Sequence, residues 1–203
     1  MDPLPTHIPN WWDKPAPVTI PDGYADFVEQ FRTLQDAMTA AAPDAEQTRT
    51  ASRLVAELIE VLKQSETDEW SQLSGRLPVP GRGQTLIPVV HINSETEHES
   101  RGTVRFGRQF LGGNGAAHGG AIPLMFDDAF GRFANAHGRA IARTANLHID
   151  YRSVTPIDTD LTVTLRFDRE EGRKRYVTGE IRDGDRLCVE ASGLFIVLKP
   201  GAA

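Results

Sequence analysis

Alternating apolar and polar residues dominate the second half of the chain, and this pattern limits the fold more than any other feature. Residues 145–151 and 161–167 carry apolar side chains at every second position, which is typical of strands with one buried face. Two further strand-like segments, 173–182 and 186–198, flank the tight turn Asp183-Gly184-Asp185, and Glu170-Glu171-Gly172 forms a similar turn before them. Turns this short join antiparallel neighbours. The pattern predicts an antiparallel sheet, with shorter strands at 86–92 and 102–106 and the final strand in its interior.

One helix interrupts these strands, and the sequence predicts it over residues 120–137. Its apolar residues share one wide stripe, and they are Ile122, Met125, Phe126, Ala129, Phe130 and Phe133. Pro123 lies in the first turn and Gly138 just beyond the last turn, as is common at helix ends. The combination predicts an α+β fold in which a curved antiparallel sheet wraps around one long central helix.

The first 83 residues differ from the rest. Six prolines within residues 1–21 disfavour both helix and sheet, so we expect an extended arm with Trp11 and Trp12 as candidate anchors. Two amphipathic helices follow. The first has apolar positions Phe27, Phe31, Leu34 and Met38, and the second begins at Asp44, with Gln47 placed for a variant of the capping box. We expect both helices to pack against the main body or a partner subunit. The Pro- and Gly-rich residues 78–83 then predict a division into an N-terminal helical extension, 1–83, and a main domain, 84–203.

Charge and cysteine content narrow the possible functions. The chain has 22 basic and 28 acidic residues, for a net charge of −6, which argues against nucleic acid or an anionic membrane as its partner. Any anionic ligand therefore needs a local basic cluster. The single cysteine, Cys188, excludes a disulfide within the chain and fits a reducing compartment. No apolar run reaches the roughly 20 residues of a membrane span, and the first residues do not resemble a secretory signal. We expect a cytoplasmic protein.

The densest functional signal is the glycine-rich run at 112–120, which leads directly into the predicted helix. Free backbone amides at a helix start, with the positive end of the helix dipole, can hold an anion or a developing oxyanion. Two nucleotide-binding interpretations fail. The dinucleotide fingerprint would need a glycine where His118 stands, and the P-loop would need Lys and Ser or Thr where Ala121 and Ile122 stand.

Two adjacent carboxylates, Asp127 and Asp128, lie just over one turn into the predicted helix. Each lies about 130° from the centre of the apolar stripe, on opposite sides, at 100° per residue. The pattern alone therefore does not choose between them. A carboxylate this near a glycine-rich helix start could act on a carbonyl carbon whose oxygen the amides hold.

These motifs resemble those of the hotdog-fold acyl-CoA thioesterases. His118-Gly119-Gly120, with Asp127 nine residues after the histidine, is similar to the H-G-G-x(6)-D pattern of the phenylacetyl-CoA thioesterase branch. More specific blocks resemble the mitochondrial thioesterase superfamily members four and five, and they are residues 144–151, Pro156, 171–174 and 190–195. The likeness covers roughly residues 84 to 199 and implies the hotdog fold.

The resemblance also implies roles for individual residues. Asp127 would be the catalytic carboxylate, either as general base or as nucleophile. Gly119 would supply the oxyanion amide, with Gly120 as a second candidate, and Thr144 would position water or substrate. For His118 the resemblance favours a structural role over proton transfer. Candidates for substrate binding are Asn114, His118, Asn146, Arg152, Arg173 and Lys174, whose basic members would meet the phosphates of coenzyme A.

We therefore predict a homodimer, or a dimer of dimers, that hydrolyses acyl-CoA to free acid and CoA at sites shared between protomers. The resemblance implies medium- or long-chain fatty acyl groups. We expect no cofactor, and no metal because the histidines show no ligand spacing such as H-x-x-x-H. One rival is an acyl-CoA binding or regulatory protein with little catalysis. Another is a hotdog dehydratase, which the absence of a D-x(4)-H arrangement disfavours.

Overall fold

A six-stranded antiparallel sheet forms the body of the protein in the computed structural model, which describes residues 18–69 and 71–199. The strand order is β1-β2-β6-β7-β8-β5, so β8 is interior and β1 and β5 are the edges. The strands are β1 (Val90–Glu95), β2 (Glu99–Val104), β5 (Ala142–Tyr151), β6 (Leu161–Glu171), β7 (Lys174–Asp183) and β8 (Arg186–Val197). The predicted antiparallel sheet and its interior final strand are confirmed. The strand predicted at 86–92 is wrong in its first half, since β1 begins only at Val90.

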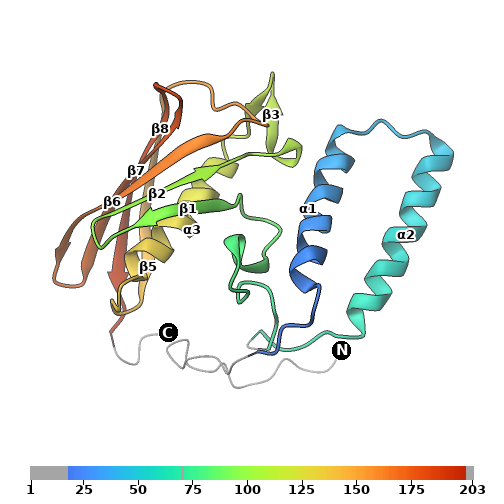
Figure 1. The fold of residues 1–203 in the computed structure, drawn as a ribbon, viewed down its shortest axis with the longest axis horizontal. Helices are drawn as coiled ribbons and strands as arrows, with labels where there is room; N and C mark the ends of the chain where they lie inside the picture. Colours follow the sequence, from blue (N-terminus) through green and yellow to red (C-terminus); the bar gives the residue numbers. More distant parts are fainter. Residues whose placement is uncertain (1–17, 70, 200–203) are drawn as a thin grey trace.

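Helix α3 (Ala121–Asn135) lies across this sheet, and its apolar stripe forms the centre of the core (Figure 1). The Phe126 and Phe130 rings, 5.1 Å apart between centroids, pack onto β7 and β8 at Gly179 and Gly193. A Cβ at either glycine would lie within 3.0 Å of these rings, so the close approach needs residues without side chains. The predicted central helix and the α+β hotdog architecture are confirmed.

The helix ends two residues earlier than predicted, and its end is tied to the start of β5. His137 and Gly138 both have positive φ, 57° and 75°, and turn the chain. The Asn135 side chain makes two hydrogen bonds to the Ala142 backbone, at 2.7 and 3.1 Å. The guanidinium of Arg175, a residue only 3% exposed, donates to the carbonyls of Ala134 and Ala140. The path from α3 into β5 is therefore fixed by hydrogen bonds.

The glycine-rich run contains a small hairpin that the sequence did not predict. Strands β3 (Leu111–Gly113) and β4 (Ala116–Ala117) pair with each other, and Asn114 and Gly115 form the turn with φ of 49° and 73°. A short 3-10 helix, η2 (Arg108–Phe110), precedes the hairpin. The run therefore enters α3 from a turn-rich segment.

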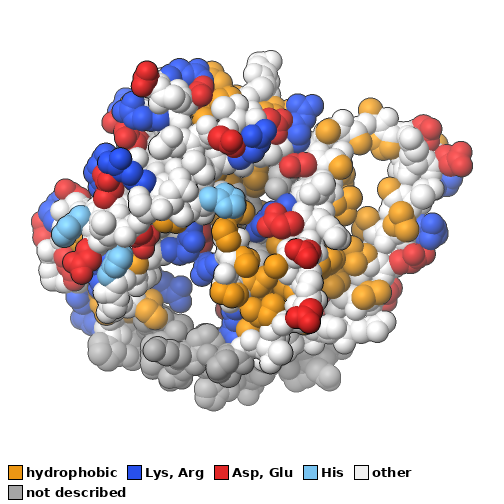
Figure 2. Space-filling model, in the orientation of Figure 1, with side chains coloured by type: hydrophobic (Ala, Val, Ile, Leu, Met, Phe, Trp, Pro, Cys, Tyr) orange, Lys and Arg blue, Asp and Glu red, His pale blue; other side chains and the backbone are white. Residues whose placement is uncertain are grey.

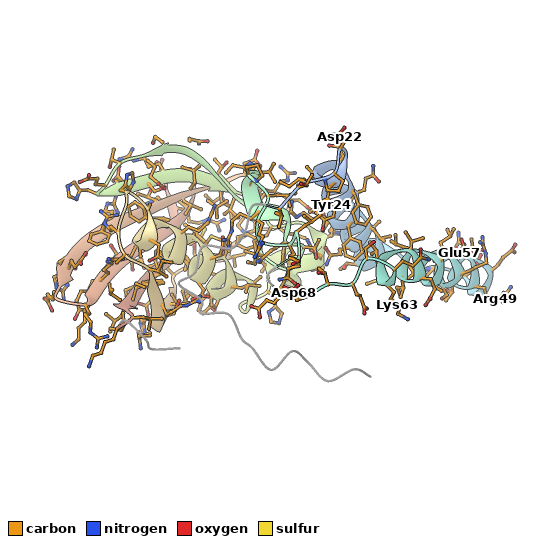
Figure 3. All side chains as sticks on the ribbon, turned by 90° about the horizontal axis from the view of Figure 1, so that it is seen from below. Asp22, Tyr24, Arg49, Glu57, Lys63 and Asp68 are labelled. Carbon is orange, nitrogen blue, oxygen red and sulfur yellow. The ribbon has the colours of Figure 1, made fainter. Side chains whose placement is uncertain are left out.

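The two N-terminal helices are present, but only one contacts the body closely. Helix α1 (Tyr24–Ala40) docks where Asp36 Oδ1 accepts the Gln109 backbone N–H at 2.8 Å. Helix α2 (Ala45–Lys63) begins with the predicted capping box of Asp44 and Gln47, yet it buries none of its residues. Figures 1 and 3 show α2 standing beyond α1, away from the sheet. The Pro-rich arm, with Trp11 and Trp12, lies mostly outside the described residues.

Between α2 and β1 the chain contains a second 3-10 segment, η1 (Pro80–Gly83), with unusual backbone angles. Gly81, Arg82 and Gly83 have consecutive φ values of 71°, 50° and 81°. Left-handed backbone costs a non-glycine residue free energy, so the conformation of Arg82 calls for a compensating contact. Among the described residues, no helix is long and apolar enough to cross a membrane.

Candidate active site

The two predicted oxyanion amides, Gly119 and Gly120, lie in the turn before α3 and differ in their hydrogen bonds. The Gly120 N–H donates to Nδ1 of His118 at 2.9 Å, so this amide is already engaged. Tyr151, at the end of β5, donates its hydroxyl to the Gly119 carbonyl at 2.6 Å and orients that residue. Within the described part of the chain, the exposed Gly119 N–H has no acceptor. Gly119 is therefore the amide that remains available to a ligand.

The structure also distinguishes the two carboxylates that the sequence pattern left equal. The side chain of Asp128 is 11% exposed and forms ion pairs with Arg82 at 2.9 Å and with Arg132 at 3.1 Å. Asp127 is exposed, and none of the described residues forms a hydrogen bond or ion pair with its carboxylate. Two guanidinium groups thus pair with Asp128, whereas no described residue forms an ion pair with Asp127. A general base or nucleophile needs such an accessible carboxylate.

A hollow of about 390 Å³ brings Asp127 and Thr144 together. Thr144 reaches it from the start of β5, opposite Phe195 of β8, which also lines it. Arg82, which has a positive φ, lines the same hollow from η1 and pairs there with Asp128. Sequence reasoning missed Arg82. The signal for it in the sequence is the unusual Pro80-Gly81-Arg82-Gly83 string, which by itself predicts only the boundary between the N-terminal extension and the main domain.

Within one chain, the free amide precedes α3 and the free carboxylate lies well inside that helix. Helix α3 begins two residues after Gly119, at Ala121, and the six residues from Ala121 to Asp127 at 1.5 Å each correspond to about 9 Å along the helix. A carbonyl carbon and its oxygen are separated by about 1.2 Å. The surroundings of these two groups are called the two half-sites below, one at the N-terminus of α3 and one at Asp127.

The predicted phosphate-binding residues are also split between the two ends of the sheet. Arg173 and Lys174 lie at the turn into β7, and the strand register places Lys174 beside Ile196, the neighbour of Arg143. Their end of the sheet is therefore also that of Thr144. Arg173 donates to the Val197 carbonyl at 2.9 Å, and both side chains are exposed.

Arg152 lies at the opposite end, immediately after β5. Its guanidinium pairs with Glu190 at 2.6 Å and with Asp150 at 3.2 Å. The hydrogen bond to Glu190, followed by the charges of Asp150 and Glu190, raises the pKa of Arg152 above its usual value. The structure therefore does not bring Arg152 together with Arg173 and Lys174, and two carboxylates already compensate its charge.

The two predicted asparagines are exposed and lie on different elements. Asn114 is at the tip of the β3–β4 turn, in the same run as His118 and Gly119. Asn146 lies on β5 opposite Leu194, just after an irregularity in the pairing that follows Thr144. Sequence order alone links each of them to one of the half-sites.

No group of three or more His, Cys, Asp or Glu side chains is placed to hold a metal ion within residues 18–69 and 71–199. His148 and His137 each approach one carboxylate, Asp150 at 3.3 Å and Glu95 at 3.4 Å. The thiol of Cys188 is buried in β8.

Comparisons with known proteins agree with this architecture. Residues 114–190 match the family model described as thioesterase superfamily. Acyl-coenzyme A thioesterase THEM4 of Rattus norvegicus is 38% identical over 96 residues, which cover 46% of this chain and 41% of THEM4. Acyl-coenzyme A thioesterase THEM5 of Homo sapiens is 28% identical over 95 residues, covering 46% of this chain and 38% of THEM5. The matches thus span about two fifths of these curated relatives.

Solved structures extend the likeness to most of the chain. The crystal structure of a thioesterase superfamily protein aligns with a TM-score of 0.72 and 28% identity, and covers 88% of this chain and 94% of its own. The PaaI protein of the E. coli phenylacetic acid degradation operon aligns with a TM-score of 0.50 and 22% identity, over 54% of this chain and 80% of its own, which shows the shared fold alone. Residues 114–190 thus match the thioesterase superfamily model, and the fold of the chain is that of the hotdog thioesterases.

Proposed function

We propose that the protein is an acyl-CoA thioesterase that works as a homodimer and hydrolyses medium- or long-chain fatty acyl-CoA. The observation that carries this proposal is the contrast between Asp127 and Asp128. Of two adjacent carboxylates, only Asp127 forms no ion pair with a described residue, and it shares a hollow with Thr144. The likeness to THEM4 and THEM5, which are acyl-coenzyme A thioesterases, supports acyl-CoA as the substrate class.

In the proposed reaction, the Gly119 N–H of one protomer holds the thioester oxygen, and Asp127 of the partner faces the carbonyl carbon. Asp127 takes a proton from water, which attacks the carbon while the C–S bond breaks. The proton then passes to the leaving thiolate, so the products are the acid and CoA. Direct attack by the Asp127 carboxylate, followed by hydrolysis of the anhydride, gives the same products. Thr144 would position the water or the substrate, and Arg173 and Lys174 would bind phosphates.

The separation of the half-sites supports a dimer with two-fold symmetry. Strand β5 is an open edge of the sheet and also contacts α3. Pairing of two β5 edges in antiparallel fashion would bring two α3 helices side by side in opposite directions. The N-terminus of each helix would then lie beside the Asp127 region of the other. The proposed site is complete only in that arrangement.

The first experiment compares Asp127→Asn with the adjacent Asp128→Asn as its matched control. We expect Asp127→Asn to lower kcat about 10²- to 10⁴-fold, the usual contribution of a positioned base, while the dimer persists in light scattering. We expect Asp128→Asn to lower kcat less than about tenfold, because this carboxylate pairs with arginines instead of substrate. Equal losses in both variants, or full turnover by Asp127→Asn, would remove Asp127 from the mechanism.

A mixing experiment tests whether the site is shared between protomers. Gly119→Pro removes the proposed oxyanion N–H, and Gly119→Ala keeps it, with a Cβ no closer than 3.5 Å to any neighbour. We expect each inactive homodimer, Gly119→Pro or Asp127→Asn, to regain activity when the two are unfolded and refolded together. Random pairing gives half heterodimers with one intact site each, or about one quarter of wild-type activity. Absence of recovery, with heterodimers present, would mean that one chain supplies both groups.

A further inference from the structure

A second hollow, of about 510 Å³, opens at the N-terminus of α3 and shares no lining residue with the hollow at Asp127. One wall comes from the C-terminal half of α1, and the opposite wall from η2 and the first turn of α3. Its apolar lining consists of Met38, Leu86, Phe110, Ala121 and Leu124. Met38 is 73% exposed and Leu86 is 67% exposed, so the edge of the hollow presents apolar side chains to a ligand.

We propose that this hollow holds the acyl chain of the substrate and that helix α1, through Met38, limits the length of chain it accepts. The inference rests on the proposed thioesterase function and names the group that sets its specificity. His118 and Gly120 line the hollow, and the free amide of Gly119 lies between them in sequence. The carbon chain of an acyl group whose carbonyl oxygen meets the Gly119 N–H would therefore start beside this hollow.

Size and chemistry both fit an acyl chain. Sites for small organic ligands are typically about 300–1,000 Å³ with mainly apolar walls and a few polar groups. A neighbouring hollow nearer the N-terminus of α1, of about 250 Å³, shares Gln109 and Phe110 with this one but is also lined by the charged residues Glu29, Arg32, Asp36, Arg105 and Asp158. Charged groups there favour water over methylene groups. Of the two hollows beside α1, only the one next to Gly119 suits a hydrocarbon chain.

The wall that α1 provides is anchored on both sides of the hollow. Asp36 Oδ1 accepts the N–H of Gln109, which lines the hollow, and Arg32 donates to the carbonyl of Gln84, just before Thr85 and Leu86. Gly107 permits this docking, because a Cβ there would lie 2.5 Å from the Asp36 carboxylate. Met38, two residues beyond Asp36 on the same helix, is therefore held at the rim.

The test measures kcat/KM for saturated acyl-CoA substrates of two to sixteen carbons. In the wild type we expect an increase of about fourfold for each buried methylene until the hollow is full, and then a plateau. Met38→Trp, which enlarges the side chain at the rim, should lower kcat/KM for long chains by at least about tenfold and leave acetyl-CoA and butyryl-CoA within about twofold. The control is Val61→Trp on α2. Val61 is exposed like Met38 but does not line the hollow, so this variant should leave kcat/KM unchanged at every chain length.

Equal effects of Met38→Trp at all chain lengths, or no effect at any length, would overturn the inference while leaving thioesterase activity intact. A second measurement keeps the test independent of turnover. Calorimetric dissociation constants of Asp127→Asn for CoA and for dodecanoyl-CoA should differ by at least about tenfold, and adding Met38→Trp should abolish most of that difference. A wild type that binds these ligands with the expected length dependence but releases no CoA would refute the proposed function alone.

Discussion

Helices α3 and α2 have similar amphipathic patterns but opposite surroundings. Eight of the fifteen residues of α3 are buried against the sheet, whereas none of the nineteen residues of α2 is buried. Figure 2 shows apolar side chains along α1 and α2 that remain visible at the surface. The exposed apolar residues of α2 are Leu54, Val55, Ile59, Val61 and Leu62. An apolar stripe thus identifies the face of a helix that tends to be buried, but long-range folding decides whether anything covers it.

The test with the largest expected effect on stability removes one large side chain from each helix. Phe130 is fully buried, and Phe130→Ala should lower the free energy of unfolding by about 3–5 kcal/mol in urea titrations. Ile59→Ala on α2 is the matched control, and it should change stability by no more than about 0.5 kcal/mol. A loss above about 2 kcal/mol for Ile59→Ala would mean that another surface covers α2 in solution.

A second pair of variants tests how tightly the sheet holds α3. Gly179→Ala places a methyl group 2.9 Å from Phe130 and 3.0 Å from Phe126, so overpacking should cost about 1–3 kcal/mol. Gly131→Ala, within α3, meets only an ordinary contact at 3.7 Å and should stabilise the protein by up to about 1 kcal/mol through helix propensity. The midpoint temperature of thermal unfolding should therefore fall for Gly179→Ala and rise for Gly131→Ala. Shifts of the same sign would contradict this account of the packing.

A third variant tests α2 without touching its apolar stripe. Asp44 accepts the backbone N–H groups of Glu46 and Gln47, and Asp44→Ala should cost the helix about 1 kcal/mol. Because α2 packs against little else, we expect faster hydrogen exchange in residues 45–50 with an unchanged global unfolding midpoint. A midpoint that falls together with the exchange protection would show that α2 unfolds as one unit with the body.

The smallest effect concerns an ion pair on the exposed sheet surface. The hydrogen bond from Arg101, helped by its charge and that of Arg166, lowers the pKa of Glu99 below the usual glutamate value. A lowered folded-state pKa stabilises the protein above the unfolded-state pKa, and this contribution is lost as pH falls through the folded-state value. Glu99→Gln should therefore be slightly less stable than wild type at pH 7 and indistinguishable from it at pH 2.5. A difference that persists at pH 2.5 would assign the effect to packing instead of charge.

Much of the fold was predictable because its signals are local. Alternation in 161–167, the turn at Gly184 and the stripe ending at Phe133 each specify an element from neighbouring residues, and the structure contains all three. Errors arose at boundaries, such as β1 beginning at Val90, where pairing with β2 determines where the strand starts. The division between residues 1–83 and 84–203 remains a prediction about folding units.

The candidate site was predictable in its residue types but not in its geometry. His118-Gly119-Gly120 and Asp127 could be selected from their order in the chain. Asp128 could not be separated from Asp127, because its partner Arg82 lies 46 residues earlier and reaches it only through the fold. The same holds for Tyr151, whose bond to Gly119 joins the end of β5 to the start of α3.

The sequence by itself determined the elements of this protein and the chemistry available at the start of its central helix, since hydrophobic period, turn residues and capping groups act over a few residues. Only the tertiary structure decided which carboxylate forms no ion pair, which glycine amide is free, and which amphipathic helix forms a wall of a hollow. Those outcomes depend on contacts between distant segments, and the local pattern of the chain does not specify them.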